Sequence, residues 1–386
     1  MRLRHRDGQV IHLGYCTNVH PAEDLPGIVR QLDSYAVAVR KLLSADVLGV
    51  GLWLPAPAAA GLAADPAEVA RLRREIAARG LEVVTLNGFP YQSFHAPVVK
   101  RAVYQPDWLT AERLDYTVNL ARVLAGLLPD DAARGSVSTL PLGWRTHWSE
   151  RRSLAVRDQL AVLAGRLAEV RAAFGRLVRV GIEPEPGCVV ESTAQAVAEL
   201  TGVDTEYIGV CLDLAHLACA WEEPAPALAR LAAAGLPVVK VQVSAALAAP
   251  RPEEPGTAAA LREYAEPRFL HQTRGPGGQA ADDLAEALEA GLPGPWRVHY
   301  HVPVHAAPRS PLRSTADVLH DAMTALAGGP AAACDHFEVE TYTWQVLPQA
   351  PATPAELVRG LASELRFTRD EMLALGLSSR VVAEAR

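Results

Sequence analysis

Residues 208–216 read IGVCLDLAH, and this stretch sets the pattern from which the fold can be predicted. Residues 208–214 form a short apolar run, as in a strand buried on both faces, and Asp213 and His216 come at its end or just after it. Runs of the same kind span residues 10–16, 47–54, 81–89, 135–142, 179–185, 238–244 and 336–342. The chain therefore predicts eight buried strands.

Longer amphipathic stretches, typical of helices, lie between these runs. They cover residues 22–44, 65–79, 110–128, 149–175, 192–202 and 223–234, and Gly80 and Gly235 follow two of them as helix C-caps. Strands that alternate with helices form right-handed βα units and a parallel sheet. In a chain of 386 residues, a (β/α)8 TIM barrel is the simplest closure. A doubly wound sheet is the alternative, but no G-x-G-x-x-G motif follows the first strand.

Residues 245–311, between the last two runs, interrupt this alternation. They contain a ninth β-like segment, WRVHYHVPVH (296–305), and a helical stretch at 279–290. We interpret 245–311 as an insertion that acts as a lid over the barrel mouth, because long loops inside a domain are usually functional. The alternative is that 297–304 is itself a barrel strand.

The composition is that of a folded globular protein, with 49% hydrophobic and 21% charged residues. A net charge of −7 argues against nucleic acid as the main partner. The five cysteines form no C-x-x-C pair and no long apolar run is present, which indicates a cytoplasmic protein without a membrane partner. We expect a single domain, 1–386, in which 353–386 forms C-terminal helices that close the barrel or serve a homo-oligomer contact.

Polar residues gather at the ends of four predicted strands, which is where a TIM barrel builds its site. Glu183 and Glu185 end the fifth run, Asp213 and His216 the sixth, Gln242 and Ser244 the seventh, and Glu340 the eighth. Carboxylate and amide oxygens with an imidazole suit a divalent ion such as Mn²⁺, Mg²⁺, Co²⁺ or Zn²⁺. Two alternatives remain open: Asp213 could cap the following helix, and arginines could pair with Glu183 or Glu340.

The segment GVCLDLAH (209–216) is similar to a G-V-C-x-D-x-x-H segment of the xylose-isomerase-like TIM barrel superfamily, which includes endonuclease IV, sugar isomerases and ketose 3-epimerases. IEPEPG (182–187), VKVQVS (239–244) and FEVET (337–341) resemble its fifth, seventh and eighth strand motifs. The resemblance implies that Glu183, Asp213 and Glu340 bind a metal, with His216 at a second metal or at the substrate. The family normally has His where this chain has Gln242, whose carbonyl oxygen could still coordinate.

Within that superfamily, the chain most resembles the EboE-type metabolite traffic proteins. The resemblance is carried by YCTNVHP (15–21), TLNGFPY (85–91), EPEPG (183–187), CLDLAH (211–216), FLHQT (269–273) and HFEVETYTW (336–344). It implies a gene-cluster enzyme that acts on a small sugar-like or cyclitol metabolite.

A polyol ligand needs ring faces and hydrogen-bonding groups at the barrel mouth. We predict that the substrate-binding residues are Asn18, His20, Trp53, Asn87, Glu185, Lys240, His271 and Trp344. His299, His301 and His305 share one face of an extended segment because they recur with period two. We choose His301 as a metal ligand, since Val302-Pro303 fixes the backbone just after it. A solvated hairpin with satisfied histidines is the alternative.

The predicted function is a metal-dependent isomerase or epimerase of a small sugar-like or cyclitol metabolite. One divalent ion, with ligands drawn from Glu183, Asp213, Gln242, Glu340 and His301, would acidify a C–H bond and stabilise an enediolate. Glu183 and Glu340 could move the proton on the two faces of the ligand, with His216 as a third catalytic residue. A non-catalytic metabolite-binding protein is one alternative. An endonuclease IV-like phosphodiesterase is another, but the second and fourth runs do not end in the histidines that this chemistry uses.

Overall fold

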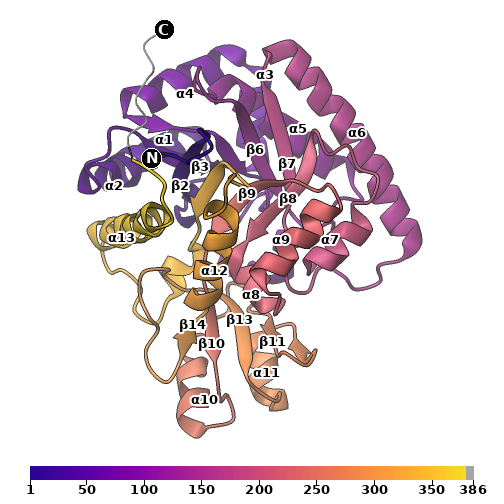
Figure 1. The fold of residues 1–386 in the computed structure, drawn as a ribbon, viewed down its shortest axis with the longest axis vertical. Coiled ribbons are helices and arrows are strands. Elements are labelled where there is room, and N and C mark those ends of the chain that lie inside the picture. The colour runs from indigo at the N-terminus through magenta and orange to yellow at the C-terminus, as the bar shows by residue number, and fades with distance from the viewer. Residues whose placement is uncertain (380–386) are drawn as a thin grey trace.

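Eight parallel strands close into a barrel in the computed structural model, which describes residues 1–379 (Figure 1). The barrel strands are β2 (Val10–Cys16), β3 (Leu48–Trp53), β4 with β5 (Leu81–Glu82 and Thr85–Asn87), β6 (Arg134–Thr139), β7 (Leu177–Ile182), β8 (Ile208–Asp213), β9 (Val238–Val243) and β15 (His336–Val339). Pairing of β2 with both β3 and β15 closes the ring, and β1 (Arg2–Arg4) adds antiparallel to β2. The predicted TIM barrel is confirmed, and each predicted run contains its strand or overlaps it.

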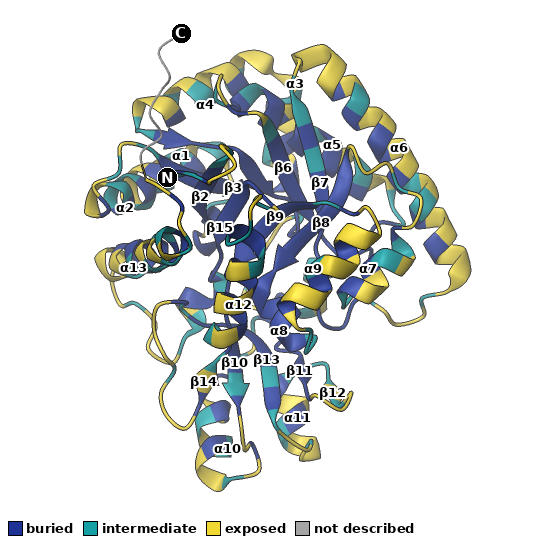
Figure 2. Cartoon of the chain, viewed as in Figure 1, coloured by how far each residue is buried: buried dark blue, intermediate teal, exposed yellow. Residues whose placement is uncertain are grey.

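Helices surround the barrel and bury their inner faces against it, as Figure 2 shows. They are α1 (Leu25–Gln31), α2 (Val37–Leu42), α3 (Ala56–Ala64), α4 (Pro66–Ala78), α5 (Ala111–Leu127), α6 (Glu150–Phe174), α7 (Thr193–Glu199), α8 (Leu214–Cys219), α9 (Pro224–Ala233), α12 (Ala316–Ala327) and α13 (Pro354–Ala374). Side-chain caps mark the N-termini of several of these helices. Asp65 accepts hydrogen bonds from two backbone N–H groups of α4, and Ser192 forms a capping box with Gln195 at α7. The predicted helix over 22–44 is instead α1 and α2 joined by a π-helical turn, Leu32–Ala36.

A buried ion pair occupies the barrel interior. The Nζ atom of Lys240, on β9, lies 2.5 Å from Oε2 of Glu338, on β15, and both side chains are fully buried. Gly51 of β3 makes room for this pair, because a Cβ atom there would lie 1.2 Å from Oε1 of Glu338. At this level the barrel interior therefore holds an ion pair, where most barrels hold branched hydrocarbon.

The segment between β9 and β15 forms a second, antiparallel sheet in the order β12-β11-β13-β10-β14. Its strands are β10 (Ala246–Ala249), β11 (Thr273–Arg274), β12 (Ala280–Ala281), β13 (Trp296–His301) and β14 (Arg313–Ser314), with α10 (Pro255–Arg262) and α11 (Leu284–Ala290) beside them. Figure 1 shows this sheet extending away from the barrel at the lower end of the view. Because β13 pairs with β10 and β11 and with no barrel strand, 297–304 is not part of the barrel.

The C-terminal region contributes one long helix. Of the predicted helical tail 353–386, α13 covers Pro354–Ala374, Ser378 then pairs with Arg4, and residues 380–386 lie outside the described residues. Within residues 1–379, no helix has the length and apolar character needed to cross a bilayer.

Candidate functional site

Three buried carboxylates meet at the carboxyl ends of the barrel strands. Glu183 directly follows β7, Asp213 is the last residue of β8, and Glu340 directly follows β15. No arginine pairs with Glu183 or Glu340 among residues 1–379, so that alternative is not what the structure shows. Glu183 and Glu340 border a cavity together with Asn18, Asn87, Phe89, Phe94, Lys100, Tyr104, Glu185, His216, Phe269, Leu270, His299, His301 and Tyr342.

Asp213 uses only one of its carboxylate oxygens within the chain. Its Oδ1 accepts hydrogen bonds from the Ser244 hydroxyl (2.8 Å) and from the His216 backbone N–H (2.9 Å), so Asp213 does cap α8. Its Oδ2 is buried and has no hydrogen-bond partner among the described residues, and the same is true of Oε2 of Glu183. A buried ionised carboxylate without a partner is costly, so both oxygens are suited to a cation.

Glu340 is oriented by two amides. Its Oε1 accepts hydrogen bonds from Nδ2 of Asn18 (2.7 Å) and Nδ2 of Asn87 (2.9 Å), so these two predicted residues hold the carboxylate. Burial, with the charges of Asp213 and Glu338, raises the pKa of Glu340 to about 8. Burial, with repulsion from Glu340 and Asp213, raises the pKa of Glu183 well above its ordinary value. The cluster therefore resists full ionisation until positive charge is placed within it.

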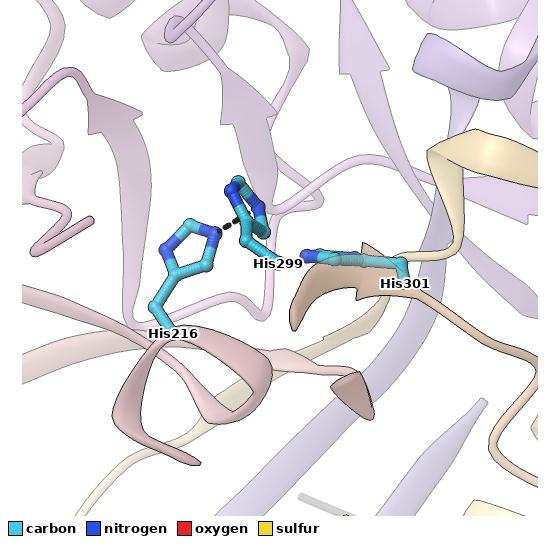
Figure 3. Close-up of side chains that lie close together, drawn as sticks. All are labelled: His216, His299 and His301. Atoms are coloured by element: carbon cyan, nitrogen blue, oxygen red, sulfur yellow. Dashed lines mark hydrogen bonds between the residues drawn. The ribbon is translucent and has the colours of Figure 1, made fainter. Parts of the chain in front are cut away.

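Three histidine rings lie beside the carboxylates: His216 from α8, and His299 and His301 from β13 (Figure 3). One ring nitrogen from each lies within 4.8 Å of the others. The Nε2 atom of His301 is 3.8 Å from Oδ2 of Asp213, and its Nδ1 is 2.8 Å from the Glu340 carbonyl oxygen. Burial lowers the pKa of His216 to about 4 and that of His299 well below its ordinary value, so both rings are neutral.

Glu185 and Gln242 add further unpartnered polar atoms. Oε1 of Glu185 accepts a hydrogen bond from the Tyr104 hydroxyl (2.6 Å), its Oε2 has no partner among residues 1–379, and burial raises its pKa to about 8. Gln242 is buried, pairs in register with Asp213, and has no hydrogen-bond partner for either side-chain polar atom among the described residues. The prediction that Gln242 is a metal ligand is therefore compatible with its place beside Asp213.

Five predicted substrate-binding residues do not line this cavity, and each has another role. Trp53 donates to the Pro90 carbonyl (2.9 Å), His20 bonds to the Tyr15 hydroxyl (3.1 Å), Trp344 donates to Glu364 (3.0 Å), Lys240 pairs with Glu338, and His271 bonds to Glu266 (2.8 Å). Their strand-end positions in the sequence do not distinguish a side chain that faces the cavity from one that supports a loop. The substrate-binding role of these five residues stays a prediction, and the contacts within the chain point to structural roles.

The aromatic wall of the cavity differs from the predicted one. Phe94, Tyr104, Phe269 and Tyr342 line the cavity. Phe94 and Phe269 lie in loops, whereas Tyr104 and Tyr342 lie in the short 3₁₀ helices Lys100–Tyr104 and Tyr342–Val346. His299 was part of the period-two pattern, but sequence reasoning favoured His301 over it. In the structure both rings border the cavity together with Glu183 and Glu340.

A family model described as xylose isomerase-like TIM barrel matches residues 39–301, and the chain belongs to this family. A search of curated proteins finds no match. Three similar solved structures cover nearly the whole chain. A xylose isomerase-like TIM barrel protein from Mycobacterium smegmatis in complex with magnesium has a TM-score of 0.52 at 11% identity, covering 94% of this chain and 98% of that one.

An L-ribulose 3-epimerase has a TM-score of 0.51 at 14% identity, covering 97% of this chain and 100% of the other. A D-psicose 3-epimerase solved in the presence of D-fructose has a TM-score of 0.50 at 14% identity, with coverage of 94% and 99%. At identities this low, the likeness to these three structures shows a shared fold and nothing more. The closer resemblance to the EboE-type group stays a prediction.

Proposed function

We propose that the chain is a metal-dependent isomerase or epimerase of a small sugar-like or cyclitol substrate. The observation that carries this proposal is the convergence of Glu183, Asp213 and Glu340 in one buried cluster, where Glu183 and Asp213 each keep an oxygen without a partner. The names of two similar structures, an L-ribulose 3-epimerase and a D-psicose 3-epimerase, support the same class of substrate.

The residues present fit a divalent cation. Two carboxylate oxygens of the cluster have no partner, and neither does the side-chain amide of Gln242. The pKa values of Glu183 and Glu340 are raised, which is expected where several acidic groups meet without a neutralising positive charge. Lys240 does not supply that charge directly, because its ammonium group pairs with Glu338 deeper in the barrel. We propose Glu183, Asp213 and Glu340 as ligands, completed by Gln242 or His301. A bound divalent ion would polarise a substrate carbonyl and acidify the neighbouring C–H bond.

The side chains of the chain itself would handle the proton. Glu183 and Glu340 follow β7 and β15, which are separated by β8 and β9 around the ring, so a substrate between them meets a carboxyl group on two sides. We propose that one removes the proton and the other returns it. Asn18 and Asn87 fix the Glu340 carboxylate for this transfer, and His216 completes the catalytic set from the first turn of α8.

The antiparallel sheet is proposed as the lid. Phe269 and Leu270 precede β11, His299 and His301 lie on β13, and all four border the same cavity as Glu340. The apolar rings of this wall would exclude water from the reacting carbon and present flat faces to the C–H groups of a polyol.

Solvent deuterium exchange tests the proposal. Metal-stripped protein is loaded with Mn²⁺, Co²⁺ or Mg²⁺ and incubated in D₂O with a panel of ketopentoses, ketohexoses and keto-cyclitols, and NMR follows deuterium at the carbon next to the carbonyl. We expect incorporation for at least one compound, lost in Glu183→Gln and Glu340→Gln and kept in the surface control Glu206→Gln. Binding of a panel compound without exchange by the loaded protein would contradict an enzyme and indicate a carrier.

A further inference from the structure

We propose that residues 93–100, in the loop between β5 and α5, form a flap that opens to admit the substrate and closes over it. The inference deepens the proposed function and rests on it, since it takes the cavity beside Glu183 and Glu340 as the substrate site. The cavity encloses about 60 Å³ of free space. Pockets for small molecules usually hold about 300–1,000 Å³. Part of the wall must therefore move before a ring-shaped substrate fits.

The wall that the insertion supplies is tied to the barrel. On β13, Nδ1 of His301 donates to the Glu340 carbonyl (2.8 Å). Next to β11, the buried side chain of Gln272 donates to the Pro186 carbonyl (2.8 Å). Both bonds join the insertion to strand-end segments of the barrel. The antiparallel sheet is therefore the fixed part of the lid, and the moving part lies elsewhere.

The opposite wall comes from the loop between β5 and α5, which spans residues 88–110 and brings Phe94 and Lys100 to the cavity. Loops of this length inside a domain are usually functional. The backbone N–H groups of Val99 and Lys100 both donate to the Arg268 carbonyl (2.7 and 2.8 Å). No other backbone hydrogen bond among residues 1–379 ties 94–100 to a segment outside 93–104. The flap is thus held to the insertion at one carbonyl oxygen.

The two ends of the flap have an unusual backbone conformation. Ser93 has a φ of 58° and Lys100 a φ of 41°. The left-handed region is costly for residues that carry a side chain. Two such residues, one at each end of a weakly tied segment, can relax to negative φ when the segment lifts, so we assign them as the hinges.

Charged side chains complete the contact between the flap and the insertion. Lys100 pairs with Asp283, and Arg101, the next residue, pairs with Asp282 (3.4 Å). The Arg101 side chain is 58% exposed. Ion pairs this close to solvent are weak and are screened by salt. They form a latch that can release and close again.

The closed flap seals the cavity with an aromatic contact. The Phe94 ring lies 5.2 Å from the Phe269 ring between centroids, and both residues are buried in one apolar cluster with Trp53 and Val99. Opening at Ser93 and Lys100 would separate this pair and give a substrate a way in. Closing would return the rings and exclude water from the reacting carbon.

Hydrogen exchange followed by mass spectrometry tests the flap in the full-length, metal-free protein. Peptides that cover 93–104 report the Val99 and Lys100 amides, which are bonded only in the closed form. We expect Lys100→Gln/Arg101→Gln to speed their exchange at least threefold, and 1 M NaCl to do the same to wild type. Asp282→Asn removes the latch from the other side and should also speed it. Arg71→Gln, which breaks an exposed ion pair on α4, is the control and should match wild type.

Val99 and Lys100 amides that exchange as slowly as those of buried β6, with no effect of salt or of either latch variant, would overturn the proposal. This measurement needs no substrate, so it decides the flap even when no panel compound exchanges deuterium and the proposed function fails. A compound that does exchange should, at saturation, slow the exchange of the same amides at least threefold. Unchanged or faster exchange in its presence would show that the segment does not close over the substrate, while the proposed function stands.

Discussion

Lys240 and Glu338 pair across neighbouring strands β9 and β15 in the middle of the barrel, 2.5 Å apart and both without solvent exposure. The pair lies two residues before Gln242 and Glu340 on their strands, so it supports the floor of the proposed site. Each charge is tolerated there because the other compensates it.

We expect Lys240→Met to destabilise the protein by about 3–5 kcal/mol, because it leaves the Glu338 carboxylate buried without its counter-ion. Urea unfolding followed by circular dichroism measures this change. The double variant Lys240→Met/Glu338→Gln should recover much of the loss, and a double variant less stable than either single variant would contradict the pairing.

Asp213→Ala should lose the metal bound by the carboxylate cluster, since Asp213 supplies one of its two orphaned oxygens. Elemental analysis after dialysis against a fixed metal concentration measures the bound metal, and we expect the affinity for the metal to fall at least 10-fold. Because Asp213 also caps α8, the matched control is Asp65→Ala, which removes only the cap of α4 and costs about 1 kcal/mol. Equal metal content in the two variants would refute the ligand assignment.

Gln242→Ala should weaken the same metal by 10- to 100-fold if the amide completes the shell, whereas His301→Ala should leave that equivalent in place. Isothermal titration with Mn²⁺ distinguishes the two, because the ion prefers oxygen donors. The reverse outcome would make His301 the ligand of the carboxylate site.

Glu364, which is not one of the proposed metal ligands, predicts a pH dependence of the stability of the fold. This buried residue of α13 accepts hydrogen bonds from Thr341 (2.6 Å), Trp344 (3.0 Å) and the Val304 backbone (3.2 Å), and burial raises its pKa to about 7. A carboxyl group with a raised folded-state pKa favours folding below its unfolded value near 4.5 and loses that contribution as pH rises through 7.

Wild type should therefore lose about 3 kcal/mol of stability from this group between pH 4.5 and pH 7.5. Glu364→Gln should flatten that part of the stability profile, measured by urea unfolding at each pH. An equally steep profile in Glu364→Gln would show that another group is responsible.

Phe269→Ala should raise KM about 10-fold for any substrate found, with kcat less affected, because Phe269 offers an apolar wall and no reacting group. Phe174→Ala removes an exposed phenylalanine and is the control. A drop in kcat alone would argue against a binding role for this wall.

The barrel could be predicted from sequence because its signal is local. Each strand is a short apolar run, and the glycines Gly80 and Gly235 adopt the positive φ that ends a helix. The carboxylates were predictable for the same reason, since the position of Asp213 at the end of an apolar run places it at the barrel mouth.

The rest of the site depends on contacts between distant segments. Phe269 lies in a loop and Tyr104 ends a short 3₁₀ helix, and no hydrophobic periodicity predicts the course of either segment. Trp53 ends β3 and His20 follows β2 closely, but their side chains bond to the Pro90 carbonyl and to Tyr15 and do not line the cavity. A side chain at a strand end faces the cavity only if the neighbouring loops do not cover it. The position of those loops depends on tertiary contacts, which the local sequence does not reveal.

The pairing of β13 with β11 has a consequence for how this site could change. Thr273 is opposite Val298, and this alignment directs His299 and His301 toward the barrel while Tyr300 packs against Tyr264 on the other face. A slip of one residue would present Val298 and Tyr300 to the cavity and withdraw both imidazoles. The hydrogen-bond alignment of two short strands thus sets which side chains this side of the site offers. A single inserted or deleted residue in the preceding turn would replace the two imidazoles with Val298 and Tyr300 while leaving the barrel intact.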